Sequence, residues 1–299
     1  MNIALLANPT AGKGRKAGLL PEVVARLRAG GHTVDVVTAG SREAMVDLGR
    51  QAVADGRAVV AMGGDGTVHL GLQAVGGTGA PFGIVPAGTG NDFAVRLGLP
   101  GDTLAAADAI AAHTGTRAVD LARVSGGGTT AWFGAVMAAG FDAFVNERAN
   151  RMRWPRGPQR YNLAIVAELL ALRSRRYQMR LDDVESEFDS VLVAIGNTES
   201  YGGGFRIVPG ADPTDGLLDV VVAEPLSRLT LMRLRPKVFK GTHVADRRVS
   251  TFRARRIELA AEGVTAYADG ERICPLPVTI ECVPGALNLI GKAPSNLIG

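Results

Sequence analysis

Two glycine-rich loops lie close together in the first third of the chain, and each carries a carboxylate. One reads Gly-Gly-Asp-Gly-Thr at residues 63–67, and the other reads Pro-Ala-Gly-Thr-Gly-Asn-Asp-Phe at residues 86–93. Glycines that follow a strand let backbone N–H groups converge on an anion, and the helix that starts behind them adds a favourable dipole. Because Asp65 and Asp92 lie in the same turns, the loops indicate phosphoryl transfer, which handles a metal ion or a hydroxyl group beside the phosphates.

The segments around both loops alternate between strand and helix patterns. Apolar runs predict strands at 2–7, 33–38, 58–62 and 82–85. Helical spacing predicts helices at 16–29, at 42–54 with Ser41 as the N-cap, and after each loop. This alternation predicts a parallel sheet covered by helices, with ligands at the carboxyl ends of the strands, where both loops fall.

From about residue 116 the pattern changes to short strands with inserted helices. The predicted strands are 118–124, 130–137, 178–181, 188–195, 217–222, 249–260, 264–268 and 278–283, and the predicted helices lie near 159–172 and 227–238. This order predicts a mainly antiparallel β-sandwich. We therefore expect a nucleotide-binding α/β domain at 1–122, which 285–299 could complete, and a β-rich domain for the second substrate at 123–284.

The composition describes a globular protein. Of the 299 residues, 46% are apolar and 21% are charged, and no apolar run reaches the length of about eighteen residues that a membrane-spanning helix needs. The N-terminus is typical of a buried strand and not of a signal peptide. Two cysteines, Cys274 and Cys282, form no disulfide framework and no metal quartet, which suits a reducing compartment. We expect a cytoplasmic protein.

The net charge of +4 is unevenly distributed, because arginines gather at 148–160, 173–180 and 247–256. These clusters have two interpretations. They could be solvated surface, or they could attract an anionic membrane surface at about 1 kcal/mol per well-placed residue. Nucleic acid is disfavoured, since no aromatic interleaving accompanies the charge.

A third glycine-containing turn, Asn-Pro-Thr-Ala-Gly-Lys-Gly-Arg at 8–15, closes the first predicted strand. It is not a Walker A loop, because the leading glycine and the hydroxyl after Lys13 are missing. Neither later loop has the dinucleotide spacing G-x-G-x-x-G. A hydride-transfer enzyme therefore loses its main support.

Together with later motifs, these turns resemble the diacylglycerol kinase catalytic-domain family, which includes soluble bacterial lipid kinases. The later motifs are Gly-Asn at 196–197, Pro-Gly-Ala-Asp-Pro-Thr-Asp-Gly-Leu-Leu-Asp at 209–219 and Asp-Gly-Glu at 269–271. The 63–67 loop is shared with NAD kinases and 6-phosphofructokinases, whereas the 86–93 loop and Asp-Gly-Glu point to the lipid-kinase branch. The resemblance covers essentially the whole chain. It implies an NAD kinase-like or phosphofructokinase-like α/β domain and a β-sandwich lipid-substrate domain.

The resemblance also implies where ATP binds. The implied nucleotide contacts are Asn8, Pro9, Thr10, Ala11, Gly12, Thr38, Gly64, Asp65, Gly66, Thr67 and Thr89. Backbone amides and small hydroxyls at these positions can reach phosphate oxygens without steric conflict. The chain departs from the family at His69 and Leu70, where Asn and Glu are common, and we expect His69 on a helix face.

Two acidic motifs acquire roles from the same resemblance. It implies a structural Mg²⁺ held by Asp212, Asp215 and the main-chain carbonyl of Leu217, although the same residues are also good turn chemistry. It implies Glu271 as the general base that takes the proton from the acceptor hydroxyl. Asp269 would orient Glu271 or help to hold the phosphate–metal network. In NAD kinases the loop aspartate is the base, so Asp65 remains an alternative.

These inferences predict an ATP- and Mg²⁺-dependent lipid kinase. Its expected acceptor is diacylglycerol and its expected product is phosphatidic acid, which places it in phospholipid biosynthesis. It would meet its lipid as a peripheral protein at an anionic membrane surface. Members of the family are often homodimers, and the residues leave this open. The sequence also leaves open a kinase for another hydroxylated lipid or lipophilic small molecule, an NAD kinase, and a non-catalytic nucleotide- or lipid-binding module.

Overall fold

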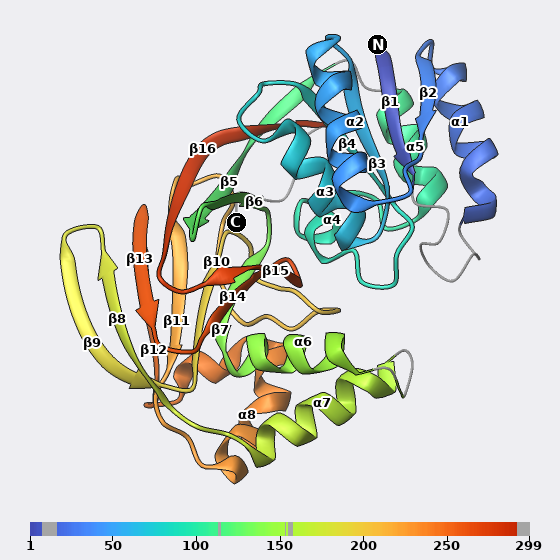
Figure 1. Cartoon of the computed structure of the whole chain (residues 1–299). Helices are drawn as coiled ribbons and strands as arrows, with labels where there is room; N and C mark the ends of the chain where they lie inside the picture. The colour runs from blue at the N-terminus through green and yellow to red at the C-terminus, as the bar shows by residue number, and fades with distance from the viewer. Residues whose placement is uncertain (8–16, 113–114, 153, 155–157, 292–299) are drawn as a thin grey trace. The chain divides into compact units, whose positions relative to one another are not determined.

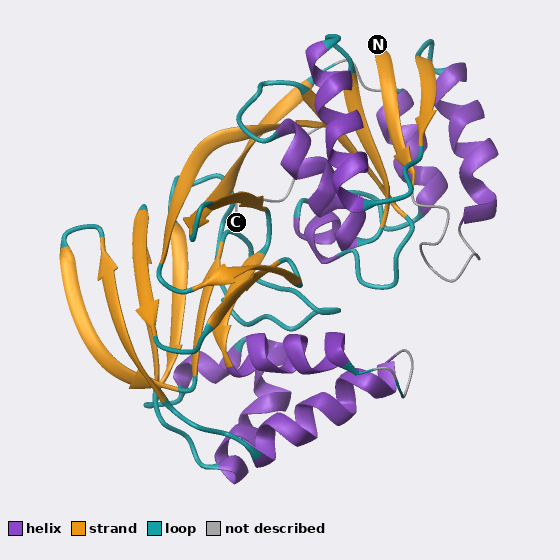
Figure 2. Cartoon of the chain, in the orientation of Figure 1, coloured by secondary structure: helices purple, strands orange, loops and turns teal. Residues whose placement is uncertain are grey.

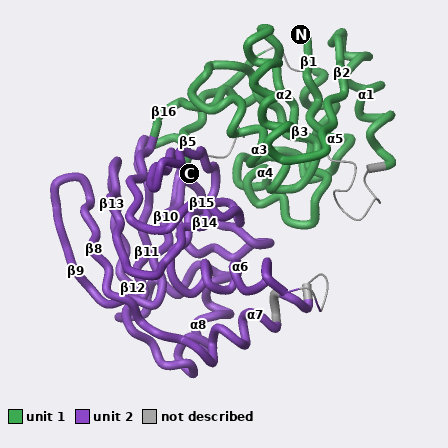
Figure 3. The backbone as a smooth tube through the Cα atoms, viewed as in Figure 1, with its two compact units in different colours: residues 1–121, 213–215, 283–299 green, residues 122–212, 216–282 purple. Residues whose placement is uncertain are grey.

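The computed structural model describes residues 1–7, 17–112, 115–152, 154 and 158–291 (Figure 1). The chain divides into two compact units (Figure 3). Unit 1 comprises Met1–Leu121, Pro213–Asp215 and Val283–Gly299, and unit 2 comprises Ala122–Asp212 and Gly216–Cys282.

Unit 1 is built on a parallel sheet in the order β2-β1-β3-β4. These strands are β1 (Asn2–Ala7), β2 (Thr33–Val37), β3 (Ala58–Gly63) and β4 (Pro81–Pro86). The last part of β16 (Val278–Ile290) pairs in parallel with β4 through Asn288 and Leu289. β1, β3 and β4 are buried along almost their whole length, as expected of a parallel sheet covered on both faces.

Two helix pairs accompany this sheet, and the strands lie between them (Figure 2). α1 (Leu20–Ala29), preceded by the 3₁₀ turn η2 (Ala17–Leu19), packs closely against α5 (Thr103–Ala111). α2 (Arg42–Ala54) packs against α3 (Asp65–Val75), and a short helix, α4 (Asp92–Arg96), follows the second glycine loop. The predicted N-cap of α2 is confirmed, because the backbone N–H of Ala44 donates to Ser41 Oγ at 3.1 Å.

Unit 2 contains two antiparallel layers. The six-stranded layer has the order β12-β11-β10-β7-β14-β15. Its strands are β7 (Val136–Gly140), β10 (Leu192–Gly196), β11 (Leu218–Ala223), β12 (Val249–Ala254), β14 (Thr265–Ala268) and β15 (Glu271–Pro275). The second layer contains β5 (Thr116–Gly126), β6 (Thr129–Phe133), β8 (Arg175–Leu181), β9 (Val184–Ser190), β13 (Arg256–Ala261) and the first part of β16. One apolar core lies between the layers and includes Met137, Ile195 and Ile257.

The helices of unit 2 gather at one end of this sandwich (Figure 1). α6 (Phe141–Arg151) and α7 (Pro158–Leu170) pack through a small cluster that includes Val145 and Ala164. α8 (Arg228–Lys240) is followed by the 3₁₀ turn η3 (Thr242–Ala245) and buries Leu234 in a separate core cluster. Ser227 caps α8 by accepting a hydrogen bond from the Thr230 N–H at 3.2 Å.

The predicted fold class is confirmed, since an α/β unit with a parallel sheet is joined to a mainly antiparallel β-sandwich with inserted helices. Three strands predicted as continuous, at 130–137, 188–195 and 249–260, are each two strands. The middle one breaks at Val191, beside Ser190, whose hydroxyl hydrogen is shared between the carbonyls of Leu192 and Ala223. The last one changes layers near Arg255, where Asp182 accepts the N–H groups of Arg255 and Arg256. Conversely, the predicted strand at 278–283 extends to Ile290, and α5, α6 and β15 were not predicted as elements.

Gly140, at the junction of β7 and α6, has a φ of 108°. A Cβ atom there would lie 2.5 Å from the Val191 carbonyl oxygen and 2.9 Å from the Tyr177 hydroxyl. Gly263, in the β13–β14 turn, has a φ of 68° and open space around it. At both positions the positive φ disfavours any residue with a side chain. Only at Gly140 would a Cβ atom also clash with neighbouring atoms.

We expect Gly140→Ala to lower the free energy of unfolding by about 2–4 kcal/mol, because strain in φ and a clash with backbone add together. Gly263→Ala should lower it by about 1 kcal/mol, the cost of the left-handed backbone alone. Urea denaturation of both variants measures the difference. Equal losses would show that the surroundings of Gly140 move to accept the methyl group.

Candidate functional site

Both glycine loops leave the parallel sheet of unit 1 at the carboxyl ends of neighbouring strands. β3 ends at Gly63 and β4 ends at Pro86, and these two residues are partners in the strand register. The N–H of Ala87 donates to the Gly63 carbonyl at 2.7 Å, which extends the pairing by one step. The sequence prediction that the loops occupy this edge is confirmed.

The two loops touch through their backbones. A Cβ atom on Gly88 would lie 2.4 Å from Gly64 Cα, and a Cβ atom on Gly64 would lie 3.2 Å from Gly88 Cα. Glycine at 88 is therefore required chiefly by the other loop, and Asn91 Oδ1 of its own loop would lie 3.0 Å from the same Cβ atom. Within the first loop, a Cβ atom on Gly63 would lie 2.2 Å from the Thr67 hydroxyl oxygen, so that position is equally closed to side chains.

A carboxylate and an amide fasten this contact. Asp65 is the first residue of α3, and its Oδ2 accepts the N–H of Asn91 at 2.9 Å. Asn91 has a left-handed φ of 59°. Its side-chain Oδ1 accepts the Gly88 N–H and its Nδ2 donates to the Gly88 carbonyl, both at 3.1 Å. The Asn91 side chain thus closes the second loop, and the Asn91 backbone N–H holds that loop to Asp65.

This geometry is compatible with the anion site that the sequence predicts at the first loop, and that site stays a prediction. α3 begins at the first loop, and the dipole of a helix of this length favours a phosphate group at its N-terminus. Thr67 is buried in the first turn of α3. Sequence reasoning assigned Gly64, Asp65, Gly66 and Thr67 to this site but did not select Asn91, although Asn91 stands in the motif that carried the resemblance.

The other predicted nucleotide contacts of unit 1 lie at or near the same edge. Thr38 directly follows β2 and is exposed, and Thr89 is exposed in the second loop. The segment 8–12 lies outside the described residues, although β1, which precedes it, ends at this edge. His69 is buried on α3, where the Gln73 amide donates to its main-chain carbonyl at 3.1 Å, as expected of a helix-face residue.

In unit 2, Asp269 and Gly270 form the two-residue turn between β14 and β15. Their φ values of 51° and 82° fit a type I′ turn, the usual geometry for Asp-Gly in a hairpin. Ala268 and Glu271 are paired on either side of the turn. Glu271 is half-buried as the first residue of β15. The turn type therefore fixes the position of Glu271 at the start of β15.

The Asp269 carboxylate is engaged by the main chain of a neighbouring loop. Its Oδ1 accepts the Ala135 N–H at 2.9 Å and its Oδ2 accepts the Gly134 N–H at 3.0 Å. From the other side of that loop, Asn197 Nδ2 donates to the Gly134 carbonyl and Asn197 N–H donates to the Ala135 carbonyl, each at 2.9 Å. Of the two roles expected of Asp269, orientation of Glu271 suits these contacts better than direct contact with phosphate.

Asn197 is a further residue that sequence reasoning did not place in the site. It is fully buried at the end of β10. The sequence did contain a motif that could have indicated it, since Gly-Asn at 196–197 is one of the motifs quoted above. No sequence motif marked the loop at 134–135, which Asp269 and Asn197 hold.

The predicted magnesium ligands Asp212, Asp215 and Leu217 lie in the connection between β10 and β11. Asp212 and Leu217 are partly buried and Asp215 is exposed. Among the described residues, no group of three or more His, Cys, Asp or Glu side chains could hold a metal ion. Two carboxylates and one carbonyl nevertheless suit Mg²⁺, which prefers oxygen ligands and retains several waters. The magnesium site stays a prediction.

A second polar pair of unit 2 lies at the start of α6. The Tyr201 hydroxyl donates to Asp142 Oδ2. Burial raises the pKa of Asp142, and the hydrogen bond from Tyr201 opposes that rise. Burial and the adjacent carboxylate raise the pKa of Tyr201 well above its ordinary value. The tyrosine therefore keeps its proton and holds the carboxylate at the N-terminus of α6.

Comparison with known proteins relates both units to one group of enzymes. Residues 2–124 match the model of the diacylglycerol kinase catalytic domain, and residues 135–291 match that of the YegS C-terminal NAD kinase beta sandwich-like domain. A diacylglycerol kinase of Mycobacterium tuberculosis is 44% identical over 291 residues, which cover 96% of this chain and 94% of that protein. A protein of Stenotrophomonas maltophilia named "probable lipid kinase YegS-like" is 32% identical, with 81% of each chain covered.

Solved structures show the same fold. A diacylglycerol kinase of Bacillus anthracis str. Sterne is similar with a TM-score of 0.73 and 21% identity, over 97% of each chain. An NAD kinase from Archaeoglobus fulgidus in complex with ATP is similar with a TM-score of 0.51 and 14% identity, over 98% of this chain and 94% of the other.

We expect Asp269→Asn to lower the free energy of unfolding by about 1–3 kcal/mol, because an amide can accept only one of the two N–H groups. Asparagine tolerates a positive φ, so the turn itself should persist. If Asp269 orients Glu271, ATP-dependent activity should fall by more than the unfolded fraction explains. Denaturant unfolding and steady-state assays measure the two effects.

Asp182→Asn is the matched control for this variant. Asp182 has a φ of 49° in the turn between β8 and β9 and also accepts two backbone N–H groups, those of Arg255 and Arg256. Because both groups donate to Oδ1 of Asp182, an asparagine oxygen can still accept them, so this variant should lose less stability than Asp269→Asn and little activity. Equal activity in the two variants would leave Asp269 with a role in the turn alone.

Proposed function

The chain belongs to the diacylglycerol kinase family, and on that premise we propose that it transfers the γ-phosphoryl group of ATP to the free hydroxyl of diacylglycerol, giving phosphatidic acid. The enzyme is a kinase, a phosphotransferase with an alcohol acceptor. The observation that carries the proposed chemistry is the contact of the two glycine loops of unit 1, with Asp65 joined to Asn91 at the start of a helix.

In this proposal the phosphates of ATP bind at the N-terminus of α3. Backbone N–H groups of the two loops and the hydroxyl of Thr67 are the proposed donors, and the dipole of α3 adds to the attraction. The segment 8–12, Thr38 and Thr89 complete the proposed nucleotide contacts. Asp65 organises the loops and the metal that accompanies the nucleotide.

The proton of the acceptor hydroxyl passes to Glu271 in the proposed mechanism. A positioned base contributes a factor of about 10² to 10⁴ in rate, and the remaining acceleration comes from alignment and charge neutralisation. Asp269 positions the hairpin turn that presents Glu271. A Mg²⁺ ion bound by Asp212, Asp215 and the Leu217 carbonyl would stabilise the connection between β10 and β11.

The identity of the acceptor is supported by the relative from Mycobacterium tuberculosis, which is named a diacylglycerol kinase. A kinase for another hydroxylated lipid would keep every motif described above. An NAD kinase shares the fold, but the match of residues 135–291 is to the YegS branch. No helix in the described part of the chain is long and apolar enough to cross a membrane. We propose peripheral access to the lipid and a place in phospholipid biosynthesis.

The proposed function is tested by radiolabelled phosphoryl transfer from ATP with Mg²⁺. The acceptors to compare are diacylglycerol micelles, other hydroxylated lipids and soluble NAD. Label in phosphatidic acid supports the proposal. Label in NAD alone would assign the chain to NAD phosphorylation, and label in another lipid would change the acceptor but keep the reaction.

We expect Glu271→Gln to bind ATP normally and to lose turnover by at least about 10²-fold, because the base is removed while the shape is kept. Asp65→Asn should instead weaken nucleotide binding. The matched control is Glu262→Gln, an exposed acid in the β13–β14 turn of the same unit, which should retain activity. Near-normal turnover of Glu271→Gln, together with an Asp65→Asn variant that binds ATP normally but does not turn over, would assign the base to Asp65.

A further inference from the structure

Two helices of unit 2 expose apolar side chains, of which Phe239 also packs on Phe205 with ring centroids 4.1 Å apart. On α7, Leu163, Val166 and Leu170 are 45%, 52% and 62% exposed. Their spacing of three and four residues places them on one face of the helix. The opposite side of α7 is the one that packs, since Ala164 is fully buried in the cluster with α6. α7 therefore has apolar residues on a packed face and on an open face.

α8 has the same arrangement. Leu229, Met232 and Phe239 are 66%, 57% and 46% exposed. At about 100° per residue they fall on one stripe of the helix. Leu234 on the other side is buried and packs into the core. Large exposed apolar side chains in a row are uncommon on the free surface of a soluble protein and indicate an interaction surface.

The two stripes belong to one end of unit 2. The Arg228 guanidinium, at the start of α8, donates to the main-chain carbonyl of Leu170, the last residue of α7. Figure 1 shows α6, α7 and α8 together at that end. Trp154, which precedes α7, is 80% exposed. We call Leu163, Val166, Leu170, Leu229, Met232 and Phe239 the α7–α8 face.

Cations border this face on α8. The helix contains no Asp or Glu, and its basic residues are Arg228, Arg233, Arg235, Lys237 and Lys240. On the helical projection they fall on both sides of the apolar stripe. Within the described residues, Arg233, Arg235 and Lys240 form no ion pair, so their charge is available to a partner.

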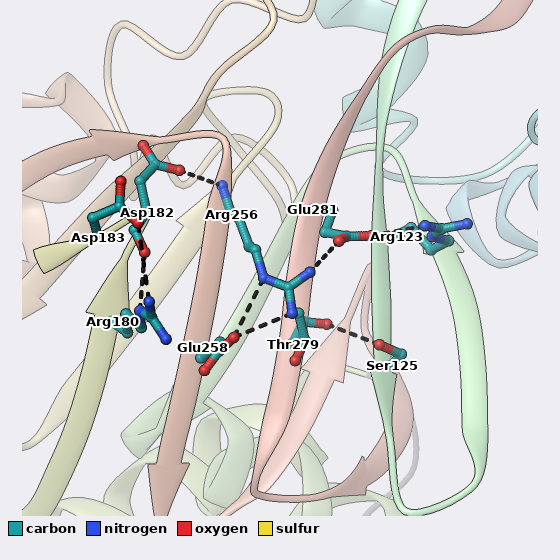
Figure 4. Close-up of polar contacts among 9 residues, drawn as sticks. All are labelled: Arg123, Ser125, Arg180, Asp182, Asp183, Arg256, Glu258, Thr279 and Glu281. Atoms are coloured by element: carbon teal, nitrogen blue, oxygen red, sulfur yellow. Dashed lines mark hydrogen bonds and ion pairs between the residues drawn. The ribbon is translucent and has the colours of Figure 1, made fainter. Parts of the chain in front are cut away.

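Seven arginines of the clusters that the sequence suggested for this task form ion pairs with carboxylates. Figure 4 shows Arg256 beside Glu258 and Glu281, and Arg180 beside Asp183. Further pairs are Arg148–Glu168, Arg151–Glu147, Arg176–Glu187, Arg248–Asp246 and Arg253–Asp219. Charge that is compensated locally contributes little to attraction over a distance.

We propose that the α7–α8 face is the surface by which the protein docks on an anionic lipid bilayer. Its apolar side chains would enter the boundary between headgroups and acyl chains, and the α8 cations would meet lipid phosphates. An apolar stripe bordered by basic residues, on a helix too short and too polar to span, is the pattern of an interfacial helix. The inference rests on the proposed lipid substrate for its purpose, but the docking itself does not require catalysis.

Sedimentation of the full chain with vesicles tests the docking surface. Vesicles of phosphatidylcholine alone are compared with vesicles that also contain phosphatidylglycerol. Leu229→Ser/Met232→Ser and Arg233→Gln/Lys240→Gln should each weaken binding to the anionic vesicles by at least about tenfold, and added salt should weaken wild-type binding. Far-UV circular dichroism of each variant checks that α8 still forms.

Two control variants have matched chemistry elsewhere in unit 2. Val184→Ser removes an apolar side chain that is 69% exposed in the β8–β9 hairpin. Arg176→Gln/Arg180→Gln removes two arginines that are each paired with a carboxylate. Both should bind vesicles within about twofold of wild type. Loss of binding in the controls with normal binding in the α8 variants would overturn the proposal.

Two further measurements separate this inference from the proposed function. On a soluble short-chain diacylglycerol without vesicles, the α8 variants should turn over as wild type does. If wild type phosphorylates no diacylglycerol but the α8 variants still lose vesicle binding, the surface stands and the proposed acceptor fails. If light scattering shows that Leu229→Ser/Met232→Ser converts an oligomer to a monomer while vesicle binding is unchanged, the face covers a second copy of the chain and the docking proposal is wrong.

Discussion

The site of unit 1 depends on the close approach of Gly64 and Gly88. The two residues follow neighbouring parallel strands, so the loops must leave the sheet together, and with 2.4 Å between Gly64 Cα and a Cβ atom on Gly88 no side chain fits between them. The bond from Asn91 N–H to Asp65 then fixes the loops to one another. This fixed arrangement suits the proposed phosphate site, because amides placed in advance cost no reorganisation when an anion binds.

In unit 2, side chains rather than a backbone contact hold the candidate catalytic turn in place. A two-residue turn decides the register of β14 and β15, and the carboxylate of Asp269 holds that turn to the main chain at 134–135. Asn197 holds the same main chain from β10. The hydrogen bonds of Asp269 and Asn197 thus place the turn that leads into Glu271.

The sequence was sufficient for the features that depend on local chemistry. Continuous apolar runs predicted the buried parallel strands, Ser41 predicted a helix start, and glycines after strands predicted the loops at the carboxyl edge. It was insufficient where a distant residue decides the conformation. The change of layer at Arg255 is held by Asp182, and the role of Asn91 depends on Asp65 in the other loop. Likewise, an arginine cluster can be counted in a sequence, but its neutralisation by acids such as Glu281 cannot.

The long strand β16 has a consequence for biosynthesis on the ribosome. Its first part, from Val278, pairs with β13, and its last part, through Asn288 and Leu289, pairs with β4. β4 is complete at Pro86, yet its outer partner emerges only after about two hundred further residues, at an elongation rate of about 5–20 residues per second. For that interval of roughly 10–40 seconds the nascent chain carries an open sheet edge, which is a template for pairing with other chains. Truncated products of translation that lack the last part of β16 would therefore leave β4 unpaired at Pro81 and Phe82 on this edge.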